Sequence, residues 1–188
     1  AFYSLFPGNW HVNIADLGDI EKGETVEDTY FAVQALVAQL VKKDVIPVLL
    51  GGSQDLVYAQ YRAYDTLDQM VNLVNIDSRF DLGDAESPIS NRSYISKIVV
   101  NQPYNLFNYS NIGYQTYFNS QDEIELMERL FFDAYRLGEV SNNFKLVEPV
   151  MRDANMVAID LAAVSAPSSG SRDIASPNGF DGKEICAL

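Results

Sequence analysis

Polar side chains follow three apolar runs in this chain, and these side chains are the residues best suited to do chemistry. The runs are residues 45–50, Val71–Ile76 and Met156–Ile159, and each is typical of a buried strand in a parallel sheet. In an open α/β sheet, ligands bind beyond the carboxyl ends of the strands. We therefore predict one functional site from the polar and acidic residues there: Gln54, Asp55, Asp77, Asp81 and Asp160. The alternative for any single Asp is a turn or helix-capping role.

Helical patterns between the runs supply the elements that must position these side chains. Thr25 and Asp28 form a capping box, and the apolar spacing after them predicts a helix over residues 25–43. A second helical stretch covers residues 54–64. Another capping box, at Ser120 and Glu123, precedes one apolar helical face: Ile124, Met127, Leu130, Phe131 and Ala134. This alternation predicts an α/β fold with a mainly parallel sheet and helices on both faces, and residues 165–171 are expected to be a loop.

The composition excludes several classes of protein. Of 188 residues, 47% are apolar and 21% charged, which favours one globular domain over residues 1–188. The formal net charge of −13 would repel nucleic acid. No apolar run approaches the roughly 20 residues of a membrane span. The single cysteine, Cys186, cannot form an internal disulfide, so a cytoplasmic location is favoured, although a chain that begins at Ala1 leaves targeting signals unjudged.

Four short blocks stand in order along the chain: residues 51–55 (GGSQD), 75–81 (NIDSRFD), 158–162 (AIDLA) and 177–184 (PNGFDGKE). They resemble the signature blocks of the ureohydrolases, the family of arginase, agmatinase and formimidoylglutamase. Residues 132–138 (FDAYRLG) are similar in texture to arginase-like proteins of Bacteroidetes. The resemblance implies a three-layer α/β/α sandwich. Since family members commonly have ~300 residues, it also implies a fragment that is incomplete at both ends.

The metal ligands of the family are only partly present. The family pattern holds two Mn²⁺ ions with a first-block His, an Asp-x-His-x-Asp block and an Asp-x-Asp block. Three positions match a ligand: Asp77, Asp81 and Asp160. Three others depart from the pattern, two where a His is expected and one where an Asp is expected: Gln54, Arg79 and Ala162. The resemblance therefore implies a degenerate metal site without a two-manganese centre.

Three close carboxylates repel one another unless a positive charge or a proton relieves them. Two alternatives stay open. In the first, the guanidinium of Arg79 replaces a cation, because arginine pairs well with carboxylates. In the second, one hard cation remains, held by the three Asp side chains and the carbonyl oxygen of Gln54. An all-oxygen ligand set of this kind suits Mg²⁺, Ca²⁺ or Mn²⁺.

Three further features carry weaker signals. Glu184 matches a glutamate that the resemblance places near the amidine nitrogens of the substrate, and it is equally an ordinary first-turn helix acid. His11, the only histidine, lies outside the four blocks and is expected to be structural. With one His and one Cys far apart in the sequence, a nucleophilic triad is unsupported. The aromatic-rich residues 104–118 suit either irregular core packing or a partner-binding surface.

Three functions from different classes remain. The favoured one is a ureohydrolase-fold protein that has lost the dimanganese centre, a catalytically inactive structural or protein-interaction module with a protein partner or as a homo-oligomer. The second is a divergent metal-dependent hydrolase of guanidino or formimino C–N bonds that uses one metal. The third is a binding module that attracts a cationic guanidino or amine ligand to an acidic cleft.

Overall fold

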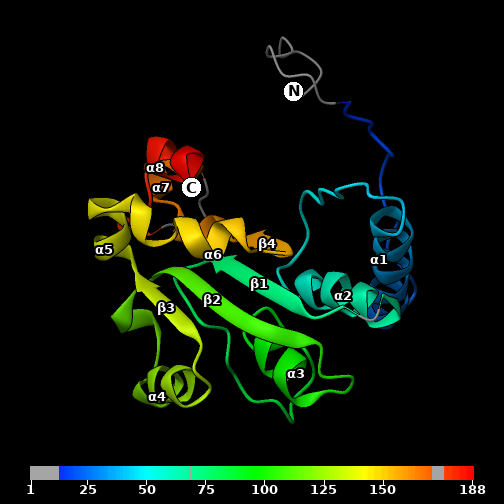
Figure 1. The fold of residues 1–188 in the computed structure, drawn as a ribbon, viewed down its shortest axis with the longest axis horizontal. Coiled ribbons are helices and arrows are strands. Elements are labelled where there is room, and N and C mark those ends of the chain that lie inside the picture. Colours follow the sequence, from blue (N-terminus) through cyan, green and yellow to red (C-terminus); the bar gives the residue numbers. More distant parts are fainter. Residues whose placement is uncertain (1–12, 68, 171–175) are drawn as a thin grey trace.

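A parallel sheet forms the centre of the molecule. The computed structural model describes residues 13–67, 69–170 and 176–188, and within them four parallel strands pair in the order β3-β2-β1-β4 (Figure 1). The strands are β1 (Val71–Ile76), β2 (Leu106–Tyr114), β3 (Asp133–Arg136) and β4 (Met156–Ile159). In the register of the sheet, Asn75 of β1 lies opposite Asn111 of β2 and Ala158 of β4. Because all pairs are parallel, the carboxyl ends of the strands share one edge, here called the carboxyl edge.

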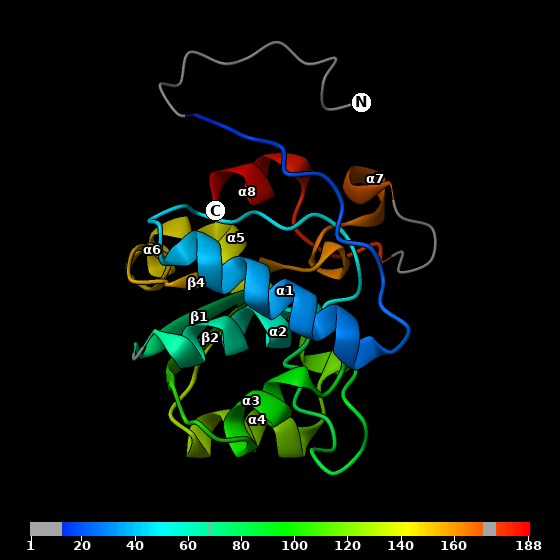
Figure 2. The same ribbon diagram turned by 90° about the vertical axis from the view of Figure 1, so that its right-hand side faces the viewer.

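Helices cover both faces of the sheet, which gives the predicted α/β architecture (Figure 2). One face carries α2 (Leu56–Arg62), α3 (Tyr94–Val100) and α4 (Gln121–Arg129), and the other carries α5 (Leu137–Asn142), α6 (Glu148–Arg152) and α8 (Gly182–Ala187). Each face has its own apolar core. Leu73 of β1 packs in the core under α2, α3 and α4, and Ile76 of β1 packs in the core under α5, α6 and α8. Side chains alternate across a strand, so an almost continuous apolar run supplies both cores.

Helix α1 (Val26–Val41) packs against α2, through Val33 and Val37. The predicted capping box at its start is confirmed, since Thr25 accepts a hydrogen bond from the backbone N–H of Asp28 and the carboxylate of Asp28 accepts from the backbone N–H of Thr25. A second confirmed capping box begins α4 at Ser120. In the described part of the chain, no helix combines the length and apolar character needed to cross a membrane.

The strand expected at residues 45–50 is wrong. This segment pairs with no strand in the described residues, and Ile46, Val48 and Leu50 expose 86%, 77% and 74% of their surface. Leu49 packs against the core between α1 and α2. A strand requires a neighbour to pair its backbone groups, and β4, the sheet member on this side, pairs only with β1.

Two smaller expectations also need correction. The apolar face expected to continue to Ala134 stops earlier, because α4 ends at Arg129 and Phe131 adopts a positive φ of 56°. Such a backbone breaks the helix, and Ala134 instead lies in β3. The loop expected at 165–171 contains a short helix, α7 (Ala166–Ser169).

Candidate functional site

Acidic side chains meet at the carboxyl edge, as the sequence predicts. Asp77 follows β1 and Asp160 follows β4, and because Ile76 and Ile159 are in register the two acids leave the sheet side by side. Asp81 lies in the chain beyond β1, with a positive φ of 55°. A non-glycine residue held in the left-handed region costs roughly 1–2 kcal/mol, and such residues cluster at functional sites.

Several buried oxygen atoms at this edge have no hydrogen-bond donor. In the described residues, the buried side-chain atoms without a partner are all acceptors, and we call them the acceptor cluster: Gln54 Oε1, Asp77 Oδ2, Asp81 Oδ1, Asp81 Oδ2 and Asn111 Oδ1. The side chain of Asp77 receives hydrogen bonds only at Oδ1, from the backbone N–H of Arg79 at 3.0 Å and from Ser78 Oγ at 3.4 Å. Buried acceptors are normally paired, so the cluster is suited to a cation or to shared protons.

Burial and mutual repulsion perturb the two carboxyls of the cluster. Burial raises the pKa of Asp81 well above its usual value, and the charge of Asp77 raises it further. Burial also raises the pKa of Asp77, and the charge of Asp160 adds to that rise. The nearby polar side chain of Gln54 and the backbone N–H of Arg79 oppose this rise in the pKa of Asp77. Both carboxyls therefore hold a proton more readily than an exposed aspartic acid does.

A buried network of hydrogen bonds lies next to the acceptor cluster. Gln54 Nε2 donates to Asn75 Oδ1 at 3.3 Å, and Asn75 Nδ2 donates to the hydroxyl of Tyr94 at 2.6 Å. The hydroxyl of Tyr109 donates to the carbonyl of Phe80 at 3.2 Å. Residues 75, 94 and 109 are fully buried, so these bonds hold the carboxyl end of β1 and the loop beyond it in one arrangement.

The guanidinium next to the acids belongs to Arg92. Its Nη1 lies 3.7 Å from Asp81 Oδ1 and lowers the pKa of Asp81. Arg79, expected to replace a cation, turns elsewhere: its Nη1 donates to the carbonyl of Phe118 at 2.8 Å, and its guanidinium stacks 4.7 Å from the Phe118 ring centre. Within the described residues, the ion pairs with acidic side chains do not include Arg79.

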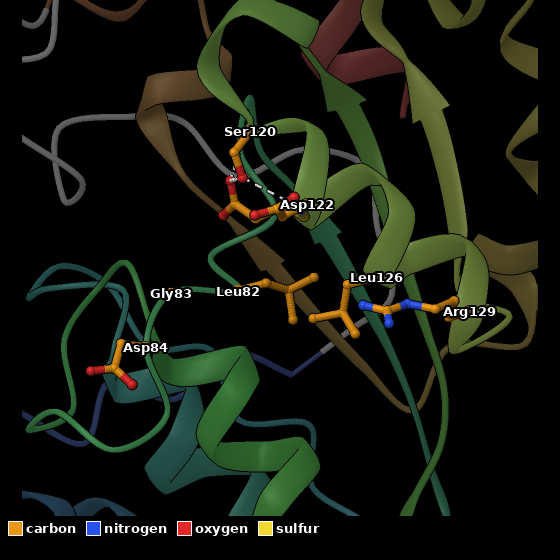
Figure 3. Close-up of a pocket in the computed structure, with 8 residues that line it drawn as sticks. Leu82, Gly83, Asp84, Ser120, Asp122, Leu126 and Arg129 are labelled. Atoms are coloured by element: carbon orange, nitrogen blue, oxygen red, sulfur yellow. Dashed lines mark hydrogen bonds between the residues drawn. The ribbon is translucent and has the colours of Figure 1, made fainter.

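Two shallow hollows open beside the site. One, of about 290 Å³, lies over Asp81 and is lined by Arg79, Gly83, Arg92, Phe118 and Glu123. The other, of about 450 Å³, shares Gly83 and Glu123 with the first (Figure 3). Figure 3 shows Leu82 and Leu126 pointing toward one another in this second hollow, between Asp84 and Arg129. The two arginines that line the first hollow are balanced in charge by its two acids, Asp81 and Glu123.

The remaining predicted site residues have local structural roles. The backbone N–H of Ala162 donates to Asp160 Oδ1 at 2.8 Å, so this carboxylate caps a short turn. Glu184 completes the capping box of α8 by accepting from the backbone N–H of Asp181 at 2.7 Å. Asp55, grouped with the acidic site, accepts from the hydroxyl of Tyr30 on α1. His11 lies outside the described residues.

The side-chain atoms of the site can be compared with the ligands that metal ions require. In the part of the chain that the structure describes, no group of three or more His, Cys, Asp or Glu side chains converges to hold a metal. The acceptor cluster instead combines two carboxyls, Asp77 and Asp81, with two carboxamide oxygens, of Gln54 and Asn111. Oxygen donors of this kind fit one hard cation such as Mg²⁺, Ca²⁺ or Mn²⁺, and they do not fit a two-ion centre with imidazole ligands.

The fold and its acidic carboxyl edge can be compared with proteins of known family. The family model described as "Arginase family" matches residues 3–166, and the chain belongs to this family. Among curated relatives, it is 33% identical over 97 residues to a formimidoylglutamase of Staphylococcus epidermidis, an alignment of 50% of this chain and 31% of the relative. It is 22% identical over 189 residues to a formimidoylglutamase of Geobacillus, covering 95% of this chain and 58% of that one.

Solved structures show the same fold. The formimidoylglutamase of Bacillus subtilis superposes with a TM-score of 0.77 at 14% identity, over 92% of this chain and 57% of that chain. A single-residue variant of the formiminoglutamase of Trypanosoma cruzi, crystallised with Mn²⁺, superposes with a TM-score of 0.80 at 16% identity, over 93% of this chain and 61% of that chain. This chain therefore spans only about three fifths of these solved proteins.

Sequence reasoning missed three residues of the site. Asn75 stands two residues before Asp77 in the same block, so its position on the strand could have identified it. Asn111 lies on β2 beside Asn75, and only the pairing of the strands reveals this. Arg92 carries no local signal, because its contact with Asp81 depends on how the long segment between β1 and α3 folds back.

Proposed function

We propose that this member of the arginase family has no two-manganese centre and is a catalytically inactive structural or protein-interaction module. Its partner is proposed to be a protein, either a second copy or a different chain, and its proposed location is the cytoplasm. In this proposal the fold presents a surface for binding a protein and does not activate water for hydrolysis.

The side chains at the metal-ligand positions implied by the ureohydrolase resemblance carry this proposal. Gln54, Arg79 and Ala162 stand there, and the guanidinium of Arg79 packs on Phe118. The methyl group of Ala162 has no lone pair for a metal. The chain has one histidine, His11, so it cannot supply two imidazole ligands. In two-metal hydrolases the ions activate the attacking water and stabilise the charge that develops during the displacement.

A one-metal hydrolase of guanidino or formimino C–N bonds is the second candidate, and the acceptor cluster favours it. Asp77, Asp81, Gln54 and Asn111 would hold one Mg²⁺, Ca²⁺ or Mn²⁺ ion. A divalent ion bound there would supply Lewis-acid chemistry and lower the pKa of a coordinated water. Without the ion, Arg92 remains the positive charge beside Asp81.

Metal content and turnover separate the two candidates. The protein is purified without chelator and dialysed against Mn²⁺, and its metal is counted by inductively coupled plasma mass spectrometry. Hydrolysis of arginine, agmatine and formimidoylglutamate is then assayed with Mn²⁺, Mg²⁺ or Ca²⁺ present. The proposal expects at most one ion per chain and no turnover above buffer. Two Mn²⁺ ions with turnover would refute it.

Substitutions at the acceptor cluster and at the implied ligand positions test whether metal binding and turnover depend on these residues. If one ion binds and turnover occurs, Asp77→Asn should abolish both, whereas the exposed Asp84→Asn should change neither, and this outcome would establish the second candidate. Replacing Arg79 by His together with Ala162 by Asp should create new Mn²⁺ affinity if these positions are lost ligand positions. A folded double variant that binds no more Mn²⁺ than the parent would contradict that assignment.

A further inference from the structure

The larger of the two hollows has an apolar floor between α4 and the segment that follows β1. Leu82 and Leu126 form this floor, and their side chains point toward one another (Figure 3). Both leucines pack in the core under α2, α3 and α4, so the floor is part of the folded core. The hollow has a volume of about 450 Å³, which is in the range of sites that bind ligands.

The rim of this hollow is acidic. Asp84 lies on one wall, and Asp122 and Glu123 come from the first turn of α4 on the other. Among the described residues that line the hollow, Arg129 alone is basic, so the lining has a net negative charge. We call this surface the acidic groove: Leu82, Asp84, Asp122, Glu123, Leu126 and Arg129.

An unpaired acceptor lies where the acidic groove adjoins the smaller hollow. The two hollows share Gly83 and Glu123, and the smaller one is lined by Asp81. Asp81 is 2% exposed, and both of its carboxylate oxygens lack a hydrogen-bond donor in the described residues. Buried acceptors are normally paired, so a bound segment that carries N–H donors would satisfy this one.

The walls of the acidic groove are already ordered. The backbone N–H of Gly83 donates to the carbonyl of Arg92 at 2.9 Å, and a Cβ at residue 83 would lie 2.6 Å from that carbonyl oxygen. The carboxylate of Asp84 accepts from the backbone N–H of Glu86 at 2.9 Å. On the other wall, a capping box fixes the start of α4. An ordered surface loses less conformational entropy when a partner binds.

Charge decides which partner the acidic groove fits. The formal net charge of the chain is −13, so the groove repels nucleic acid, anionic membranes and other acidic proteins, a second copy included. The longest run of basic residues in this sequence is Lys42-Lys43, which Asp44 follows, so a second copy offers no strongly basic segment. A basic segment of a different protein is complementary in charge, and its apolar side chains would cover the leucine floor.

We propose that the acidic groove binds a segment of a different protein in which basic and apolar residues alternate. Its lysine or arginine side chains pair with Asp84 and Asp122, and an apolar side chain between them covers Leu82 and Leu126. A further basic side chain reaches the carboxylate of Asp81. The proposal rests on the interaction role proposed above, and it adds the surface and the chemistry of the partner.

Titration with synthetic peptides, followed by nuclear magnetic resonance of the isotope-labelled protein, tests the proposal. The probe is the capped hexapeptide KLKKLK, and its controls are KSKKSK, which keeps only the charge, and ELEELE, which keeps the leucines and reverses the charge. We expect KLKKLK to shift amide signals of residues 82–84 and 120–129 and to bind at least about fivefold more tightly than either control, because charge and apolar contact both contribute. Equal binding of a control, or shifts spread over acids elsewhere, would overturn the proposal.

Matched charge reversals on α4 locate the contact. Asp122→Lys changes an exposed residue of the acidic groove, whereas Glu125→Lys makes the same change at an exposed residue of the same helix outside the lining. Asp122→Lys should weaken KLKKLK binding about three- to tenfold, and Glu125→Lys by less than about twofold. Asp84→Asn, on the opposite wall, should weaken it about two- to threefold. Equal effects of the two reversals would indicate unspecific attraction to an acidic protein and would overturn the proposal.

This test is separate from the test of catalysis. Metal content and turnover show whether the protein binds two ions and activates water, whereas the peptides report on the acidic groove. Failure of KLKKLK to bind overturns only the present proposal, and two Mn²⁺ ions with turnover refute the proposed function whatever the peptides do. Light scattering during gel filtration tests the other occupant: a dimer that Asp122→Lys dissociates would show that a second copy covers the groove, and it would overturn the proposal.

Discussion

Replacing Asp81 by Asn should stabilise the protein at neutral pH. Asp81 is 2% exposed, and neither of its carboxylate oxygens accepts a hydrogen bond. Its neighbour Asp77 carries the same charge and raises the pKa of Asp81. Asn has nearly the same shape but no charge, so the substitution removes repulsion without opening a cavity.

The expected gain in stability is the repulsion between Asp77 and Asp81 less the attraction between Asp81 and Arg92. Two carboxylates about 4 Å apart repel by about 4 kcal/mol at an effective dielectric constant of 20. Arg92 Nη1, at 3.7 Å, offsets part of this, but its side chain is 43% exposed and therefore screened by water. Proton uptake by the pair relieves a further part. We expect a net gain of about 1–3 kcal/mol in the free energy of unfolding at pH 7.5.

The gain should depend on pH in a defined direction. Burial raises the pKa of Asp81 above its unfolded value of 3.8, so between these two values the folded state binds more protons than the unfolded state. The stability of the parent protein then falls as the pH rises through this window. As the pH falls toward 3.8 and below it, the carboxyl takes up a proton in the unfolded state as well, so at pH 4 the variant should lose most of its advantage. Urea unfolding at pH 4 and pH 7.5, followed by far-ultraviolet circular dichroism, measures both values.

An exposed aspartate provides the control for this comparison. The pKa of Asp84 is lowered by hydrogen bonds from Ser87 and the backbone of Glu86, so Asp84→Asn should leave stability unchanged or slightly reduced. The reasoning is refuted if Asp81→Asn destabilises the protein at pH 7.5, or if its effect is the same at both pH values. In either case the acceptor cluster would have partners that neutralise it fully.

Three further substitutions test the packing around the site. Gly113→Ala should cost about 2–4 kcal/mol of unfolding free energy by urea titration, because φ is +100° and the new Cβ would lie 2.5 Å from Phe180 Cε2. Tyr94→Phe should cost about 1–3 kcal/mol in the same assay, because it leaves Asn75 Nδ2 without its 2.6 Å partner. Thr25→Ala should cost about 1 kcal/mol through loss of the α1 cap, and hydrogen exchange in the first turn should accelerate.

Each of these changes has a matched control. Gly138→Ala, in α5 with nothing within 4 Å of the added Cβ, should not destabilise. Tyr104→Phe alters a tyrosine that is 60% exposed and should be neutral. Thr25→Ser keeps the capping oxygen. A control that costs as much as its paired substitution would show that the named contact is not the cause.

Local sequence signals predicted the elements that depend on short-range physics. The capping boxes at Thr25 and Ser120 begin α1 and α4 as expected, because a cap involves only four consecutive residues. The runs Val71–Ile76 and Met156–Ile159 form β1 and β4, since continuous apolar runs can be buried only inside a layered fold. The acids at the ends of both strands then meet at one edge because the strands are parallel.

Contacts between distant segments could not be read in this way. Residues 45–50 have the composition of a strand, but strand formation requires a neighbour, and the described chain provides none beyond β4. Arg79 stands in the predicted block, yet its guanidinium packs on Phe118, and Arg92 reaches Asp81 instead. A long side chain has several rotamers of similar energy, and the surrounding tertiary contacts choose among them.

The sequence alone thus determined the parallel α/β arrangement, the two strand-end acids Asp77 and Asp160, and the departure of Gln54, Arg79 and Ala162 from the family pattern. Only the tertiary structure decided which charges and acceptors meet. It joined Asn111 to the acceptor cluster through the pairing of β1 and β2, turned Glu184 to a helix cap, and placed β3 and β4 at the two edges of the described sheet. The physical reason is that propensity and periodicity act over a few residues, whereas side-chain contacts depend on packing between segments far apart in the chain.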